Sequence, residues 1–247
     1  MSQSNLKKNL NSLISSFNFT SPKKFRLIII FGLLGDFDSF EYGINLSNYL
    51  KVIKQKDDLE VFGVAIGNLE GKRKFCEFTN FPERNLRLVS DNKIHNNLGV
   101  SSGLDIGMGG WVNMFLMLIG IGSSKTVSEV LRGYIGDRKS NQIFSDNDQI
   151  TFFNSLSFSG KLFNKTFGKG YLRPFELATF RLNNMIEIIS NWNDYIIDPK
   201  FLPQRTASFL INENNDVIYK YFSKDILNYS NNMSIPLEFL RKNLRND

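Results

Sequence analysis

Residues 26–34 read RLIIIFGLL and lead directly into GDFDSFEYG at 35–43. A continuous apolar run rich in isoleucine is typical of a parallel strand that is covered by helices on both faces. Two further runs of this kind follow, LEVFGVAIG at 59–67 and LRLVSD at 86–91, and each is preceded by a segment with helical spacing. This β-α-β-α-β order predicts an α/β fold built on a parallel sheet.

The alternation of strands and helices stops between about residues 100 and 203. We expect a helical insertion there, made of an apolar helix from Trp111 with a break at Gly120 and Gly122, a polar loop with short elements over 136–170, and a helix that starts near Pro174. The segment 111–121 is the most apolar of the chain. It is far shorter than the roughly 20 residues that span a membrane, so we expect a buried helix.

The end of the chain returns to strands. TASFLI at 206–211 and DVIYKYF at 216–222 flank an Asn-rich turn and predict an antiparallel hairpin, followed by a closing helix from near Ile235. A thioredoxin-like mixed sheet has this order of elements. We therefore predict an N-terminal extension over 1–24 and one thioredoxin-like domain over 25–247, interrupted by the insertion.

The composition excludes several classes of protein. The formal charge is +6, but five of the 30 basic residues lie within residues 1–26, where there is no acid, and the other 25 nearly match the 24 acidic residues. A nucleic-acid-binding body is therefore not expected. One Cys and one His exclude an intramolecular disulfide and leave a Cys/His zinc site without enough ligands. We expect no metal and no cofactor.

The N-terminal extension has the spacing of an amphipathic helix. Its apolar residues recur at helical intervals with Lys and Ser between them, namely Leu6, Leu10, Leu13, Ile14 and Phe17. A basic helix of this kind can rest on a membrane surface or a partner, or serve as a transit peptide. The interpretation we favour is a helix that packs on the domain.

From about Arg26 to Leu240 the chain resembles the peroxiredoxin-like branch of the alkyl-hydroperoxide-reductase/thiol-specific-antioxidant (AhpC/TSA) family, and more narrowly its cyanobacterial and chloroplast members. The resemblance is carried by FGLLGDFDSFEYG at 31–43, KFCEFTNFP at 74–82, GYIGDRK at 133–139, GKGYLRPFELATFRLNNM at 168–185 and QRTASFLINENNDVIY at 204–219. It implies a thioredoxin-like fold, redox or antioxidant chemistry, and a bacterial cytoplasm or plastid stroma, including the thylakoid surface.

The resemblance also locates the loop that would carry the catalytic cysteines. Thiol-active relatives read Gly-Cys-x-x-Cys where this chain reads Gly35-Asp36-Phe37-Asp38-Ser39, so Asp36 and Ser39 stand in the cysteine positions. Neither residue can form the sulfenic acid that peroxide reduction requires. Asp36 and Asp38 are then candidates for acid/base or metal-binding carboxylates, or for capping groups at the start of a helix, which is the interpretation we favour.

Two other residues are candidates for a site. Cys76 follows Lys72, Arg73 and Lys74, which would lower its pKa if they lay close to the thiol and would make it a one-Cys peroxidatic centre. It also lies between phenylalanines, and we favour a buried structural Cys. The resemblance marks Arg205 as a relic of a site that polarises peroxide; the alternative is an ordinary surface or ion-pairing Arg.

The remaining polar residues carry weaker signals. His95 lies in the polar stretch DNKIHNNLG, and we expect it to be a solvated helix residue. Charged residues inside the insertion are expected to form either a buried ion network or a site for an anionic ligand; they are Arg132, Asp137, Arg138, Lys139, Lys169, Arg173, Glu176 and Arg181.

Two functions remain open at this point. The first is a non-catalytic binding, assembly or regulatory module that contacts a protein partner through the insertion or the N-terminal helix. It predicts a buried Cys76 and an exposed apolar patch. The second is an antioxidant enzyme that uses Cys76, and it predicts an accessible thiol of low pKa.

Overall fold

The computed structural model describes residues 3–17, 23–53, 58–152 and 156–244. Its centre is a five-stranded sheet with the strand order β3-β2-β1-β6-β7. The strands of this sheet are β1 (Phe25–Leu33), β2 (Leu59–Ile66), β3 (Leu86–Val89), β6 (Ala207–Asn212) and β7 (Val217–Phe222).

The direction of the strands matches the sequence prediction. β1 runs parallel to β2, and β2 runs parallel to β3, whereas β6 runs antiparallel to both β1 and β7. In the register, Leu27 is paired with Val61 on one side and with Leu210 on the other. The three apolar runs and the C-terminal hairpin are therefore confirmed as one mixed α/β sheet.

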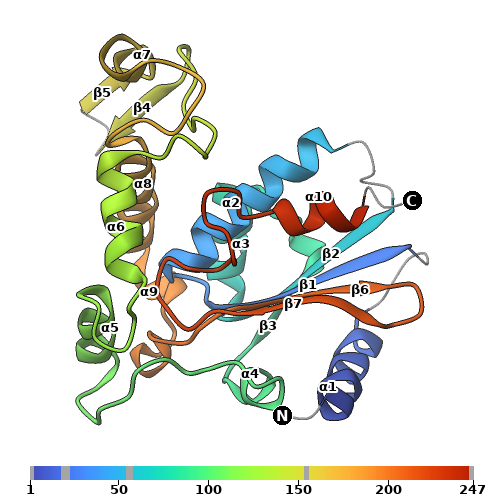
Figure 1. Ribbon diagram of the computed structural model, residues 1–247. Coiled ribbons are helices and arrows are strands. Elements are labelled where there is room, and N and C mark those ends of the chain that lie inside the picture. The colour runs from blue at the N-terminus through green and yellow to red at the C-terminus, as the bar shows by residue number, and fades with distance from the viewer. Residues whose placement is uncertain (1–2, 18–22, 54–57, 153–155, 245–247) are drawn as a thin grey trace.

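Helices cover both faces of the sheet, which explains the unbroken apolar run in β1 (Figure 1). On one face Ile29 and Phe31 pack against a cluster that includes residues of α2 (Phe37–Val52), α3 (Leu69–Thr79) and α10 (Glu238–Leu244). On the other face Ile28 and Ile30 pack against a cluster built from α1 (Gln3–Ser15) and the end of α4 (Lys93–Asn97).

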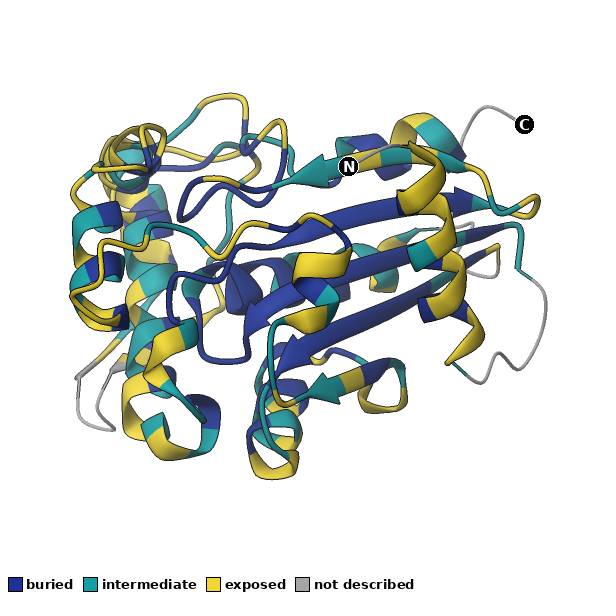
Figure 2. Ribbon diagram, turned by 90° about the horizontal axis from the view of Figure 1, so that it is seen from below, coloured by how far each residue is buried: buried dark blue, intermediate teal, exposed yellow. Residues whose placement is uncertain are grey.

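The N-terminal helix belongs to this core. Leu6, Leu10, Leu13 and Ile14 are buried in the same cluster as Ile28 of β1. Figure 2 shows α1 lying across the buried strands of the sheet. The predicted helix and its packing on the domain are confirmed. Because its apolar face is occupied by the sheet, that face is not free to contact a membrane while α1 stays docked.

The insertion lies beside one end of the sheet (Figure 1). It contains α5 (Gly110–Leu118), α6 (Thr126–Ile135), the strands β4 (Gln149–Phe152) and β5 (Leu156–Ser159), α7 (Lys161–Phe167), α8 (Glu176–Ser190) and α9 (Trp192–Tyr195). Single turns of 3-10 helix occur at Glu83–Asn85 and Pro199–Phe201. The predicted break after the apolar helix is confirmed, since Gly120 and Gly122 both have positive φ angles.

The short elements expected within 136–170 include β4 and β5, which pair antiparallel. One feature of the insertion differs from the prediction. The segment 111–121, expected to be buried, has large exposed side chains, with exposed fractions of 51% for Trp111, 61% for Phe115 and 53% for Ile119. Apolar composition does not determine whether a neighbour covers a helix, and only one side of α5 has such a neighbour. No helix within the described ranges is long and apolar enough to cross a membrane.

Candidate functional site at the end of strand β1

The loop 35–39 connects β1 to α2, and its first aspartate caps the helix. Asp36 is the N-cap residue of α2, and its Oδ1 accepts a hydrogen bond of 2.6 Å from the backbone N–H of Ser39. The other oxygen, Oδ2, lies so close to Gly32 that a Cβ atom added to this glycine would be 2.2 Å from it. The capping interpretation of Asp36 is therefore confirmed, and Gly32 is needed because any side chain there would displace the carboxylate.

The second aspartate of the loop forms a buried ion pair. Arg205 Nη1 donates to Asp38 Oδ2 at 2.8 Å, and both side chains are almost fully buried. The same guanidinium also donates from Nε to the carbonyl of Pro203 at 2.7 Å. Arg205 is thus an ion-pairing Arg, and its position beside the loop links the first turn of α2 to the segment that precedes β6.

Burial decides the protonation behaviour of this loop. Burial away from solvent raises the pKa of Asp36 to about 6 and that of Asp38 to about 7. The Arg205 guanidinium lowers both pKa values but does not cancel the effect of burial. Several buried oxygens nearby have no hydrogen-bond partner among the described residues, namely Asp36 Oδ2, Asp38 Oδ1, Ser39 Oγ, Gln204 Oε1 and Thr206 Oγ1. The polar atoms of the loop therefore form a buried cluster.

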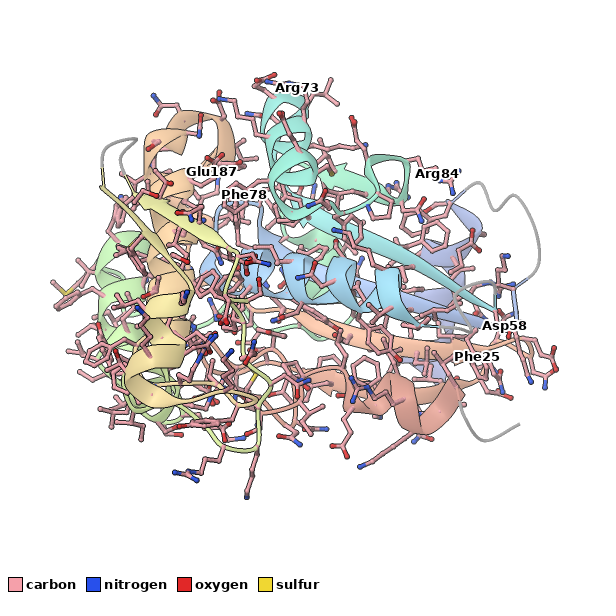
Figure 3. The ribbon with its side chains drawn as sticks, turned by 90° about the horizontal axis from the view of Figure 1, so that it is seen from above. Phe25, Asp58, Arg73, Phe78, Arg84 and Glu187 are labelled. Atoms are coloured by element: carbon pink, nitrogen blue, oxygen red, sulfur yellow. The ribbon has the colours of Figure 1, made fainter. Side chains whose placement is uncertain are left out.

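Cys76 lies in α3, within the core cluster under the sheet. Burial raises the pKa of its thiol to about 12; Glu83 adds to this shift and Lys72 opposes it. The neighbouring cations are engaged elsewhere, because Arg73 pairs with Glu70 and Glu77, and Lys74 pairs with Asp194. Figure 3 shows Arg73 projecting away from the body of the protein. The accessible thiol of low pKa that the redox enzyme requires is not what the structure presents.

His95 is not the solvated residue that its sequence context predicts. Its side chain is fully buried, and its Nε2 lies 2.6 Å from the carbonyl oxygen of Phe31 in β1. The carbonyl can only accept, so Nε2 carries the proton, and burial lowers the pKa of the imidazole. The prediction was wrong because the short helix α4 leans on the sheet, which local polarity does not reveal.

The charged residues of the insertion form the predicted ion network. Arg173 and Glu176 make a fully buried pair, and the carboxylate of Glu176 also accepts 2.7 Å hydrogen bonds from the backbone N–H groups of Ile143 and Phe144. Arg181 of α8 pairs with Glu41 of α2 at 2.6 Å and so attaches the insertion to the core.

The rest of that charged set divides between inner and outer positions. Arg132 of α6 pairs with Glu129 at 2.8 Å and lies 3.6 Å from Asp137. The other three residues are placed outside, with Arg138 over the ring of Tyr171, Lys169 in an exposed pair with Asp146, and Lys139 exposed. The inner cations already have carboxylate partners, which favours the ion network over an anion site.

The outer surface of α5 and α6 carries an apolar face that sequence analysis did not locate. It is defined by exposed side chains at helical intervals: Phe115 and Ile119 on α5, and Val127, Leu131, Tyr134 and Ile135 on α6. Glu129 and Arg132 of α6 turn inward to their ion pairs. As a result, no exposed residue among the described positions of α5 and α6 carries a charge. The apolar composition of 111–121 gave part of the signal, but we assigned it to a buried helix.

Comparisons with known proteins add no relative. The chain matches no protein-family model, no curated protein and no solved structure.

Proposed function

We propose that this protein is a peroxiredoxin-like member of the thioredoxin fold that has lost thiol catalysis and acts as a binding or assembly module. The fold assignment is supported by the sheet, in which β2 and β1 are parallel and β6 and β7 complete one edge as an antiparallel hairpin before α10. The loss of catalysis is supported by the two aspartates of the loop, which are used for capping and ion pairing.

The observation that carries the proposal is the apolar face of α5 and α6. Six large side chains about half exposed present on the order of 600 Å², since a fully buried aromatic side chain covers about 150–250 Å². This approaches the roughly 800 Å² that each partner contributes to a standard protein interface. A patch of about 600 Å² is at the upper end of what a monomeric protein exposes, and patches of that size are often contact surfaces.

The partner whose chemistry fits this face is a second copy of the chain. An uncharged apolar face is complementary to itself, because two copies can meet about a twofold axis without burying an unpaired charge. The charged side chains of α6 are withdrawn into the insertion, as such a contact requires. The compartment expected from the resemblance, a bacterial cytoplasm or a plastid stroma, rests on the resemblance alone.

Sedimentation velocity over a concentration series tests this proposal. We expect the native chain to dimerise and Leu131→Glu to weaken the dimer by at least about tenfold, since the loss of one buried leucine contact and its replacement by a charge exceeds about 1.4 kcal/mol. Leu69→Glu is the matched control, because Leu69 is also exposed but lies on α3, outside the apolar face. A native chain that stays monomeric, or equal weakening by both variants, would contradict self-association.

A second measurement tests the loss of thiol catalysis. Cys76 should react with a maleimide or with hydrogen peroxide only after denaturation, because its thiol is buried and its pKa is raised to about 12. Rapid modification of the folded protein near neutral pH would restore the antioxidant enzyme as the better interpretation.

A further inference from the structure

A cavity of about 470 Å³ opens between the insertion and the end of β1. Its walls come from the loop before α2, from α5, α8 and α9, and from the turn before β6; the lining residues are Gly35, Asp36, Phe37, Trp111, Met114, Met185, Ile188, Ile189, Trp192 and Leu202. The volume lies in the range of about 300–1,000 Å³ that is typical of small-molecule sites. Ligands of open α/β sheets bind beyond the carboxyl ends of the strands, and this cavity lies beyond that end of β1.

The walls of the cavity are almost entirely apolar. Trp111 and Trp192 stack with their ring centroids 4.6 Å apart and form one side. Met114 and Met185 contribute flexible thioethers that adapt to the shape of a ligand. Asp36 is the one ionisable residue among the described lining positions, and its two oxygens are directed to the backbone of Ser39 and against Gly32.

The cavity is open at a rim of exposed side chains. Trp111 is 51% exposed and Ile189 is 60% exposed, although both line the cavity. Solvent therefore reaches walls that offer it few hydrogen bonds. Water in such a space is displaced favourably by an apolar group. An anion would lose its hydration beside an acidic residue, and a cation would meet only Asp36, whose oxygens face Ser39 and Gly32.

We propose that this cavity binds an uncharged, mainly hydrocarbon small molecule. The chemistry of the walls selects the class. Tryptophan, methionine, isoleucine and leucine side chains provide contact area, and the two oxygens of Asp36 are withdrawn from the cavity, one capping α2 and the other buried against Gly32. This binding goes beyond self-association through the apolar face, because the cavity shares helix α5 with that face but is lined by none of the six residues that define it.

The test uses the two tryptophans of the chain, both of which line the cavity. Their intrinsic fluorescence therefore reports on this site without interference from other tryptophans. We expect the uncharged probe N-phenyl-1-naphthylamine to quench it saturably with one site per chain, and dodecanol to displace the probe. Absence of quenching, or linear uptake without saturation, would overturn the proposal.

A matched pair of substitutions separates the cavity from general surface adsorption. Ile189→Lys places a charge at the rim and should weaken probe binding by about tenfold, the effect of losing most of one isoleucine contact. Leu162→Lys on α7 is the control, since Leu162 is 55% exposed and belongs neither to the cavity lining nor to the apolar face; its probe affinity should stay within about twofold of the native value. Equal weakening by both would overturn the proposal.

A second variant keeps the test decisive if Ile189→Lys perturbs the helix. Trp111→Ala removes one side of the cavity at a half-exposed position, and the fluorescence of the bound probe itself then reports binding. Affinity unchanged from the native value would contradict the proposal. A negative result in these probe-binding measurements does not contradict the proposed function, because dimerisation is measured separately with Leu131→Glu.

Discussion

In the sheet, the apolar side chains are buried and few charges are present, whereas the insertion buries its ion pairs and exposes apolar side chains. Ile28 and Ile29 of β1 are fully buried on opposite faces, while Phe115 and Ile135 of the insertion are more than half exposed. Conversely, Arg173 and Glu176 of the insertion are fully buried as a pair. The sheet thus has the distribution expected of a self-sufficient core, and the insertion has that of a contact surface held in place by charges.

The largest expected effect is the difference in stability between two phenylalanine substitutions, one in the core under the sheet and one on the apolar face. Phe75 of α3 packs edge-to-face with Phe31 and Phe40, at ring distances of 5.7 and 5.3 Å. Phe75→Ala should lower the free energy of unfolding by about 3–5 kcal/mol, because it leaves a cavity in the core. Phe115→Ala, the matched change on the apolar face, should leave monomer stability within about 0.5 kcal/mol. Urea unfolding measures the free energy of unfolding of both variants. Similar losses in the two would contradict the proposed difference between the core and the apolar face.

The buried ion pair of the insertion provides the next test. Arg173→Met leaves the Glu176 carboxylate buried without its cation and should cost about 3 kcal/mol of unfolding free energy. This is the lower end for broken buried pairs, because three backbone N–H groups, those of Ile143, Phe144 and residue 173, still donate to it. Lys169→Met removes a cation from the exposed pair with Asp146 and should leave stability unchanged. If Arg173→Met has the same free energy of unfolding as the native protein, the buried ion pair does not stabilise the insertion.

The loop at the end of β1 predicts a smaller, pH-dependent effect. The pKa values of Asp36 and Asp38 are raised to about 6 and about 7, above their ordinary value of 3.8. The folded state therefore binds protons more tightly than the unfolded chain, so their contribution to stability is present below about pH 4 and is lost as the pH rises through 6 to 7.

Asp36→Asn isolates this contribution, because asparagine keeps the N-cap and does not titrate. Relative to the native chain, the variant should gain on the order of 1–3 kcal/mol of unfolding free energy between pH 4 and pH 8. Asp91→Asn is the flat control, since contacts with Lys93 lower the pKa of Asp91 and its titration therefore falls below this pH range. Chemical denaturation across this pH range measures both, and a constant difference for Asp36→Asn would contradict the assignment.

The two regions also differ in how well the sequence predicted them. Strands β1, β2 and β3 and the hairpin β6–β7 were predicted closely, because apolar runs and turn residues are local signals that a buried sheet strengthens. The capping role of Asp36 was predicted for the same reason. The burial of His95 and the exposure of Trp111 were not predicted, because each depends on segments distant in sequence. His95 contacts Phe31 of β1, whereas no described element covers the exposed half of Trp111.

The sequence by itself determined the α/β class, the order of the strands along the chain and the helical insertion. Those features follow from periodicity, turn chemistry and residue identity, which are properties of neighbouring residues. Only the tertiary structure decided that Asp38 meets Arg205, that the Cys76 thiol is buried, and that α5 and α6 present an apolar face beside a cavity. These depend on which surfaces meet when distant segments pack, and packing is a property of the whole chain.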